Sequence, residues 1–339
     1  MQIAVVILNW NGKSLLEQFL PSVVSNTPEN VQIIVADNNS TDDSVAFVKS
    51  TFPNIEIIIN DNNYGYAQGY NEALKHVKAD VFVLLNSDVE VSKGWIEEAE
   101  KVLSTEENIA ALQPKILSFK NKDEFEYAGA GGGFIDRYGF PFCRGRIFNS
   151  LEKDQGQYND VTEIFWASGA CMFIKSKVFF ELNGFEDEFF AHMEEIDLCW
   201  RIHNAGYKIM VAPNSVIYHV GGGTLKQNSP RKTYLNFRNN LLMLYKNSPA
   251  KGFAMVLFKK LILDGVAALK FLFSVGASHF MAVLKAHIYF YSTLSTRKKQ
   301  RKESVQLEAN ALSHIQYRKS VVWQYFLKGT KLFKDLNWN

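Results

Sequence analysis

Apolar runs and helical patterns alternate over the first hundred residues of the chain. Runs with the length and β-branched content of strands lie at 3–8, 32–36, 55–59 and 81–85. Helical segments lie between them at 14–25, 44–51 and 68–78, each preceded by a residue that can turn or cap the chain. This alternation predicts an α/β fold with a mostly parallel central sheet.

Polar residues follow each of these four strands directly. They occupy 9–11, 37–39, 60–63 and 86–88. Ligands of such sheets bind beyond the carboxyl ends of the strands. We therefore expect the four polar segments to meet at one edge of the sheet and to form a ligand site there.

The pattern loosens from about 114 to 160 into glycine-rich and aromatic-rich segments, which predict a loop or an irregular meander. Regular structure is expected again at 162–175, in a helix at about 193–205 and in a strand at 208–218. A flexible glycine turn is expected at 221–223. Residues 1–240 are thus expected to form one domain, with halves at about 1–113 and about 114–240.

The region 241–339 differs in kind and is expected to be helical. Residues 252–294 are apolar and aromatic, but interspersed charges leave no clean apolar stretch of about 18 residues for a membrane span. A helix lying in the membrane interface fits better, followed by the basic cluster 297–302, which suits anionic lipid. The alternative is a helical hairpin that packs on the first domain, with a solvated basic loop.

Composition and charge narrow the function classes. With 47% apolar residues, the chain can bury a large core and is not disordered. Residues 1–224 hold 17 Lys and Arg against 31 Asp and Glu, whereas 225–339 hold 20 against 4. The acidic part suits a metal ion and the basic part an anionic surface or phosphates, so a nucleic-acid partner is not expected.

The N-terminus and the cysteines bear on the compartment. The first apolar run lacks a basic flank and is too short for a signal peptide, so we expect a strand and a cytoplasmic protein. Cys143, Cys171 and Cys199 are odd in number and lack CxxC spacing. They are therefore expected as buried thiols and not as disulfides or zinc ligands.

Two carboxylates at strand ends are candidates for ligand binding. Asp88, after the run 81–85, can bind Mg²⁺ or Mn²⁺ and, through the ion, a diphosphate. Asp37 can accept a hydrogen bond from a pyrimidine N–H or a ribose hydroxyl. The alternative for each segment is a turn or a helix cap.

These motifs together resemble the inverting glycosyltransferases of family 2, which have the GT-A fold, and within them the rhamnosyltransferase-like group. The matching segments are 7–12, 35–40, 62–71, 84–88, 169–172 and 189–198, in the family's order. The resemblance covers residues 3 to about 240. It implies that 1–113 binds a nucleotide sugar and that 114–240 binds the acceptor.

The resemblance also implies residue roles on the donor side. Asn9 and Asn11 would lie beside the nucleoside, Asp37 would hold the base, and the loop with Gly65 and Asn71 would close over the nucleotide. The donor-binding set is Asn9, Asn11, Asp37, Asn39, Gly65, Asn71, Asn86, Asp88 and Arg238. The donor would be a UDP-, dTDP- or GDP-sugar.

The implied metal ligands are Asp88 and His219, with Mg²⁺ or Mn²⁺ as the cofactor. Asn86 stands where the family often has Asp, so the ion would depend on one protein carboxylate and a later ligand. His219, after the strand 208–218, can reach the metal or the phosphates. The alternative for His219 is a neutral imidazole bonded to a backbone carbonyl.

A general base is needed to deprotonate the acceptor hydroxyl as it attacks opposite the leaving diphosphate. The family's acidic pair falls on Glu194 and Glu195, at an expected helix start, and Glu195 is the first candidate for the base. Glu replaces the Asp of the family there, which leaves open which of the two points at the acceptor. The alternative is a solvated helix start, and Asp197 with Arg201 fits an ordinary salt bridge.

Acceptor contacts are expected at Trp166, Ser168 and Gly169, because an aromatic ring near a small-residue turn is a usual sugar platform. The alternative places Trp166 in the core. Together these features predict a metal-dependent, inverting transferase that extends a cell-surface glycan or a lipid-linked glycan, peripheral on the inner face of the cell membrane. The rival functions are a sugar-phosphate nucleotidyltransferase and a non-catalytic module that binds nucleotide sugars.

Overall fold

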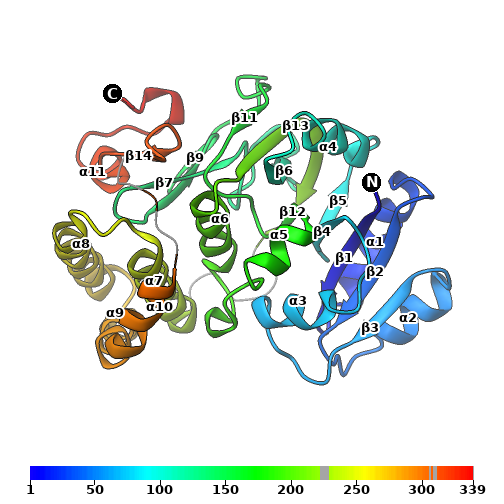
Figure 1. The fold of residues 1–339 in the computed structure, drawn as a ribbon, viewed down its shortest axis with the longest axis horizontal. Coiled ribbons are helices and arrows are strands. Elements are labelled where there is room, and N and C mark those ends of the chain that lie inside the picture. The colour runs from blue at the N-terminus through cyan, green and yellow to red at the C-terminus, as the bar shows by residue number, and fades with distance from the viewer. Residues whose placement is uncertain (222–228, 305–306, 308–310, 339) are drawn as a thin grey trace.

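A computed structural model describes residues 1–221, 229–304, 307 and 311–338. Its centre is a nine-stranded sheet with the order β11-β13-β6-β12-β4-β1-β2-β3, in which β5 pairs with β13 (Figure 1). The N-terminal strands are β1 (Ile3–Asn9), β2 (Gln32–Asp37), β3 (Glu56–Ile59) and β4 (Val81–Asn86). The helices between them are α1 (Lys13–Asn26), α2 (Ser44–Thr51) and α3 (Ala67–Leu74). The expected α/β alternation is confirmed.

Strands β3, β2, β1 and β4 are all parallel, and their register aligns the polar strand ends. Asn9 lies opposite Asp37, and Leu8 lies opposite Asn86. The residues that follow these strands therefore emerge at one edge of the sheet, as the strand pattern predicts.

The other half of the sheet is mixed, because β12 is antiparallel to both β4 and β6. Its strands are β5 (Val89–Val91), β6 (Ile109–Ser118), β11 (Thr162–Glu163), β12 (Cys171–Lys175) and β13 (Lys208–His219). The helices here are α4 (Trp95–Leu103), α5 (Ser176–Glu181) and α6 (Glu194–Asn204), with the 3-10 turn η1 (Asp187–Phe189) before α6. Residues 114–118 were expected in a loop. They extend β6 instead, because β13 pairs alongside them.

The irregular region predicted after 114 contains a second, five-stranded sheet. It consists of β7 (Gly133–Asp136), β8 (Pro141–Cys143), β9 (Arg146–Ile147), β10 (Ser150–Leu151) and, from the C-terminal part of the chain, β14 (Gln316–Tyr317). Neighbouring strands from β7 to β10 form an antiparallel meander, whereas β14 pairs with β7 in parallel. Tyr317 is fully buried and packs with Phe142 and Trp338. The C-terminal segment therefore shares a core with the meander.

The core lies on both faces of the central sheet, because successive residues of a strand point to opposite sides. Val5 and Ile7 of β1 pack in one buried cluster with residues of α1 and α4. Ala4 and Val6 pack in the other cluster, with residues of α3, α6 and α7. This two-sided burial explains why the parallel strands are nearly continuous apolar runs.

Helices α7 (Pro230–Asn247), α8 (Phe253–Ser274), α9 (Ala277–Ser292) and α10 (Leu294–Glu303) gather on the side of the molecule opposite β1 to β3 (Figure 1). The last elements are α11 (Val321–Phe326) and the 3-10 turn η2 (Phe333–Asp335). The expected division at residue 240 falls within α7, so a division into independent domains stays a prediction. Residues 222–223 of the expected glycine turn lie outside the described residues.

A buried ion cluster fastens the α8–α9 hairpin. The Lys260 ammonium lies 2.6 Å from Oδ1 of Asp264, and the His287 Nε2 lies 3.2 Å from Oδ2 of the same residue. Asp264 is fully buried, so this pairing compensates for charges that burial would otherwise penalise. Within the described residues, no helix combines the length and the hydropathy that crossing a membrane requires.

Candidate functional site

The Asp37 carboxylate, at the edge of the sheet, is held by a set of hydrogen bonds from its neighbours. The side-chain amide of Asn9 donates to Oδ1 of Asp37 at 2.8 Å, and the Ser40 hydroxyl donates to the same oxygen at 2.6 Å. The backbone N–H of Ser40 donates to Oδ2 at 2.8 Å. Asp37 and Asn9 are each 1% exposed, so the carboxylate is fixed in orientation before any ligand arrives.

Two exposed turns flank this carboxylate. Asn11 has a left-handed backbone, and its side-chain oxygen accepts the N–H of Thr41 at 2.7 Å. Asn39 is left-handed as well, and its amide donates to the carbonyl of Asp61 at 3.1 Å. The two asparagines expected at the donor therefore shape the loops around Asp37.

A network of asparagine side chains connects this edge to the loop that contains Gly65. Asn38 donates to the Gly65 carbonyl at 2.8 Å and accepts from the Asn60 amide at 2.8 Å. Gly65 has a φ of 73°, and a Cβ there would lie 2.8 Å from the Phe190 ring and its carbonyl. Only glycine fits this position without displacing the neighbouring loop.

The end of β13 brings His219 to the Asp88 carboxylate. His219 Nε2 lies 3.1 Å from Oδ1 of Asp88, and its Nδ1 lies 3.4 Å from Oε2 of Glu126. Burial alone would lower the pKa of His219, but Asp88 and Glu126 raise it to about 10. Burial likewise opposes ionisation of Asp88, yet the hydrogen bond from His219 keeps the pKa of that carboxyl below 3.8. Sequence reasoning missed Glu126, which follows no strand and matches no motif.

Asp88 and His219 fit a divalent cation in part. Asp88 Oδ1 and His219 Nε2 can supply two neighbouring ligands once the imidazole has lost the Nε2 proton that it donates to Asp88, and such ions commonly take the remaining ligands from substrate phosphates and water. Nδ1 of His219 makes no hydrogen bond, although Glu126 lies close to it. Within the described part of the chain, no group of three or more His, Cys, Asp and Glu side chains has metal-binding geometry.

The acidic pair at the start of α6 has one unbonded buried oxygen in each side chain. Glu194 is 5% exposed, and Oε2 of both Glu194 and Glu195 is buried without a hydrogen-bond partner. Burial raises the pKa of Glu194 far above its ordinary value, and the neighbouring charge of Glu195 raises it further. Burial raises the pKa of Glu195 as well. The other titratable groups that feel these charges are the Tyr66 hydroxyl and the Cys199 thiol.

Tyr66 and a short turn connect the acidic pair to the strand ends. The Tyr66 hydroxyl donates to the Gly169 carbonyl at 2.8 Å, and the Tyr66 N–H donates to the Phe190 carbonyl at 2.9 Å. The next residue of the turn, Ala170, accepts the backbone N–H of Asn86 at 3.0 Å. Tyr66 thus links the turn at Gly169 to the loop before Glu194, and the same turn bonds to Asn86, two residues before Asp88.

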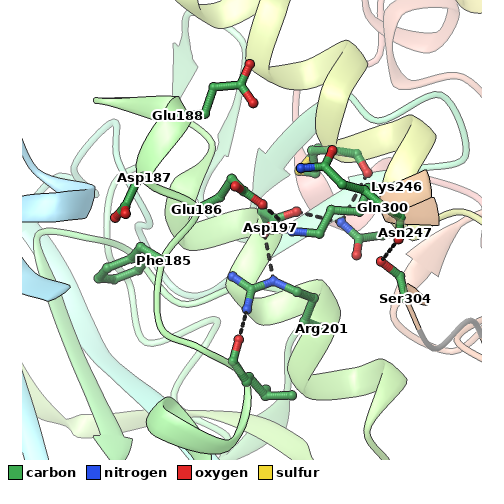
Figure 2. Close-up of polar contacts among 12 residues, drawn as sticks. Phe185, Glu186, Asp187, Glu188, Asp197, Arg201, Lys246, Asn247, Gln300 and Ser304 are labelled. Atoms are coloured by element: carbon green, nitrogen blue, oxygen red, sulfur yellow. Dashed lines mark hydrogen bonds and ion pairs between the residues drawn. The ribbon is translucent and has the colours of Figure 1, made fainter. Parts of the chain in front are cut away.

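Behind the pair, Asp197 joins α6 to α7 (Figure 2). It accepts from Arg201 Nε at 2.8 Å, from Asn247 Nδ2 at 2.7 Å and from the Lys246 ammonium at 3.3 Å. Burial opposes ionisation of Asp197, but Lys246 and Arg201 hold its pKa below the ordinary value. The expected salt bridge with Arg201 is therefore confirmed, and it belongs to a larger cluster that fixes the base of α6.

Some expected ligand contacts are occupied by the protein itself. Trp166 is 3% exposed and donates its indole N–H to the Phe134 carbonyl at 2.8 Å, so its ring lies in the core and offers no face to a sugar. The Ser168 hydroxyl donates to the Ala128 carbonyl at 2.7 Å.

Two residues expected at the donor also bond within the protein. Asn71 donates to the Phe185 carbonyl, and Arg238 donates to the carbonyl of Glu188. Gly169 is partly exposed beside Tyr66.

Comparison with known proteins gives the following similarities. The sequence model "Glycosyl transferase family 2" matches residues 4–180. The chain is 24% identical over 233 residues to the N-acetylglucosaminyl-diphospho-decaprenol L-rhamnosyltransferase of Mycobacterium tuberculosis H37Rv, covering 63% of this chain and 75% of that one. It is 23% identical over 256 residues to the low-salt glycan biosynthesis hexosyltransferase Agl10 of Haloferax volcanii, covering 71% and 74%.

Structural similarity points to the same fold. A crystal structure of GalNAc-T7 with UDP, GalNAc and Mn²⁺ superposes with a TM-score of 0.62 at 17% identity. The match covers 97% of this chain, which spans 57% of the length of that one. The fold is therefore that of the GT-A glycosyltransferases, a mixed α/β sheet with C-terminal helices, as the sequence pattern predicts.

The raised pKa values of the acidic pair predict a stability change with pH. In the unfolded chain both carboxyls ionise above about pH 4.5, whereas the folded pair retains a proton. Folding therefore takes up protons above pH 4.5, and the free energy of unfolding falls as the pH rises from about 4.5 through the raised pKa values of the folded pair. We expect Glu194→Gln to raise the Tm at pH 8, with a gain that shrinks towards pH 4.5. Thermal unfolding followed by circular dichroism measures this. The exposed Glu29→Gln is the control, and a pH-independent difference for Glu194→Gln would contradict the prediction.

Proposed function

Because the chain belongs to glycosyl transferase family 2, we propose that it moves a hexosyl or deoxyhexosyl group from a nucleoside diphosphate sugar to an acceptor hydroxyl with inversion. The acceptor is a glycan or a lipid-linked glycan of cell-surface polysaccharide biosynthesis. The observation that carries this proposal is the Glu194–Glu195 pair, in which Oε2 of each side chain is buried without a hydrogen-bond partner, connected through Tyr66 and the turn at Gly169 to the strand end before Asp88.

The chemistry assigns different states to the two carboxyls. Glu194 is the more buried of the pair and retains its proton, which leaves Glu195 ionised and partly accessible. The Glu195 carboxylate takes the proton of the acceptor hydroxyl while the hydroxyl oxygen bonds to the anomeric carbon. The bond from that carbon to the diphosphate oxygen breaks, and the diphosphate leaves with the electron pair. Attack opposite the leaving group inverts the anomeric centre.

The donor side supplies binding and orientation. Asp37 and its neighbour Asn9 hold the nucleoside, and the loop that contains Gly65 covers the nucleotide. Asp88 and His219 would hold Mg²⁺ or Mn²⁺, which when bound neutralises charge on the leaving diphosphate. The donor is a UDP-, dTDP- or GDP-sugar, and these contacts do not distinguish a hexose from a deoxyhexose, which differ by single hydroxyls.

Two similarities support the choice of substrates. The mycobacterial relative is named for an L-rhamnosyl donor group and a decaprenol-linked acceptor, and the haloarchaeal relative is named for hexosyl transfer. The first name contains a lipid-linked acceptor, and the second describes glycan biosynthesis. A lipid-linked acceptor in turn requires that the enzyme work at a membrane.

The α8–α9 hairpin is the surface we propose for that contact. Each helix presents a stripe of exposed apolar side chains at helical spacing. The stripes are Met255, Phe258, Ile262, Val266, Leu269 and Phe273 on α8, and Met281, Leu284, Ile288 and Tyr291 on α9. Exposed Lys259, Lys270 and Lys285 lie on the same helices, and Lys298, Lys299 and Lys302 follow on α10. Such a combination suits the interface of an anionic membrane on its cytoplasmic face.

We expect Glu195→Gln to lower kcat by about 10²- to 10⁴-fold, because it removes the proton acceptor and keeps the shape of the side chain. Release of the nucleoside diphosphate from a panel of nucleotide sugars measures the rate in the presence of an acceptor glycan. Glu97→Gln, in the exposed first turn of α4, is the matched control and keeps the wild-type rate. A Glu195→Gln enzyme with the wild-type rate would exclude this residue as the base.

We expect Asp88→Asn to weaken Mn²⁺ binding by at least about tenfold, because it removes the only carboxylate proposed as a ligand. Electron paramagnetic resonance of free Mn²⁺, with and without UDP, measures the affinity independently of turnover. Asp123→Asn is the control, since that carboxylate pairs with Lys153 in an exposed salt bridge. Equal Mn²⁺ affinity in wild type and Asp88→Asn would overturn the metal assignment.

We expect the double change Phe273→Glu and Ile288→Glu to abolish sedimentation with vesicles that contain phosphatidylglycerol. The two side chains are 85% and 67% exposed, so their replacement removes apolar contact with lipid and leaves the core intact. Val161→Glu, at a 50% exposed site outside the hairpin, is the control. Wild-type protein that stays in the supernatant with anionic vesicles would refute the proposed membrane surface.

A further inference from the structure

The loop that leads into the acidic pair has an unusual backbone. Phe190, His192 and Met193 all have positive φ values, 61°, 71° and 71°, although none is glycine. Such a backbone is unfavourable for a residue with a side chain and persists only where the surroundings determine it. Glu194 follows Met193 directly, so the same backbone sets the direction in which the pair enters the site.

One side chain of α7 bonds to most of this loop. The amide nitrogen of Asn239 lies 2.9 Å from the Phe189 carbonyl, 3.0 Å from that of Ala191 and 2.8 Å from that of His192. Asn239 is fully buried. Its two N–H groups are thus shared among three carbonyls that the left-handed turns point at one spot.

Arg238 supports the same arrangement from the neighbouring position. Its Nε donates to Oδ1 of Asn239 at 2.8 Å, which fixes the orientation of the amide. One terminal nitrogen donates to the Glu188 carbonyl at 2.7 Å. In Figure 2 the Glu188 carboxylate points away from the Asp197 cluster. It pairs with Arg297 of α10 at 2.7 Å and accepts from the Tyr289 hydroxyl of α9 at 2.5 Å.

The opposite side of the loop is held by the donor half of the site. The Phe190 carbonyl accepts the Tyr66 N–H, and the Phe190 ring closes against Gly65. Asn71 donates to Phe185 and to Asp187 at 2.8 and 2.7 Å. The loop therefore lies between the nucleotide loop on one side and α7 on the other.

From these contacts we propose that Asn239 is a positioning residue for the Glu194–Glu195 pair. Its amide holds the backbone of residues 190–193, three of which have a positive φ, in the one conformation that aims Glu195 at the acceptor, and Arg238 orients that amide. This inference rests on the proposed function, because it assigns Asn239 a role through the general base. It takes no part in binding the nucleotide.

The test compares Asn239→Ala with wild type in three measurements: kcat at saturating substrates, the Kd of the nucleoside diphosphate that stabilises the wild type among UDP, GDP and dTDP, and the Tm. We expect kcat to fall at least tenfold and the Kd to stay within twofold. Asn26→Ala is the matched control, because its amide also donates to two carbonyls, those of Ser22 and Val91. The fall in Tm of Asn26→Ala measures how much stability is lost when such an amide is removed, and we expect its kcat to stay at the wild-type level.

Hydrogen exchange supplies a readout that does not depend on activity. We expect the amides of residues 190–195 to exchange faster in Asn239→Ala than in wild type, and those of β1 to be unchanged. Arg238→Gln changes a partly exposed position. We expect it to speed exchange at the same amides and to lower kcat by a smaller factor, so it serves as the test variant where Asn239→Ala does not fold.

Each outcome separates this inference from the proposed function. Two results would overturn the positioning role, provided that Glu195→Gln still loses activity. One is an unchanged kcat in Asn239→Ala. The other is a weaker binding of the nucleoside diphosphate that accounts for the whole loss of activity in that variant. If Glu195→Gln keeps its activity, the proposed base fails instead. Faster exchange at 190–195 together with a selective fall in kcat supports the inference.

Discussion

The parallel register of β2, β1 and β4 is the constraint on which the site depends. It places Asn9 opposite Asp37 and Leu8 opposite Asn86, so three polar strand ends emerge together. A slip of one residue would turn Asp37 to the other face of the sheet and break its bonds to Asn9 and Ser40. The buried apolar residues on both faces of the strands fix this register, and the hydrogen bonds around Asp37 depend on it.

The acidic side of the site is built by different means and at a cost. Glu194 is buried and Glu195 half-buried, Oε2 of each is buried without a hydrogen-bond partner, and the turn before them has a positive φ at three non-glycine positions. The hydrogen bonds of Asp197 and of the α7 side chains hold the start of α6 and the turn before it in place, against the cost of burying the acidic pair. Such local strain beside strong anchoring is typical of a site that needs a perturbed carboxyl.

Most of the fold and the meeting of the polar strand ends at one edge of the sheet could be predicted, because apolar periodicity and strand ends are local properties. The strands from β1 to β4 and the helix α6 lie within a residue or two of the expected ranges. The errors have tertiary causes. Trp166 finds its partner in the Phe134 carbonyl of the second sheet, Glu126 reaches His219 from a loop, and Arg297 of the basic cluster turns inwards to Glu188. No spacing in the sequence indicates these contacts, since each depends on segments that meet only in the folded chain.

The pairing of β14 with β7 has a consequence for biogenesis. A ribosome makes the chain from the N-terminus at about 5–20 residues per second. The aromatic cluster of Phe134 and Phe142 stays incomplete until Tyr317 and Trp338 have been synthesised and have left the exit tunnel. Nascent chains therefore expose these rings to chaperones throughout translation of the helical region, and a polypeptide released early keeps them unprotected.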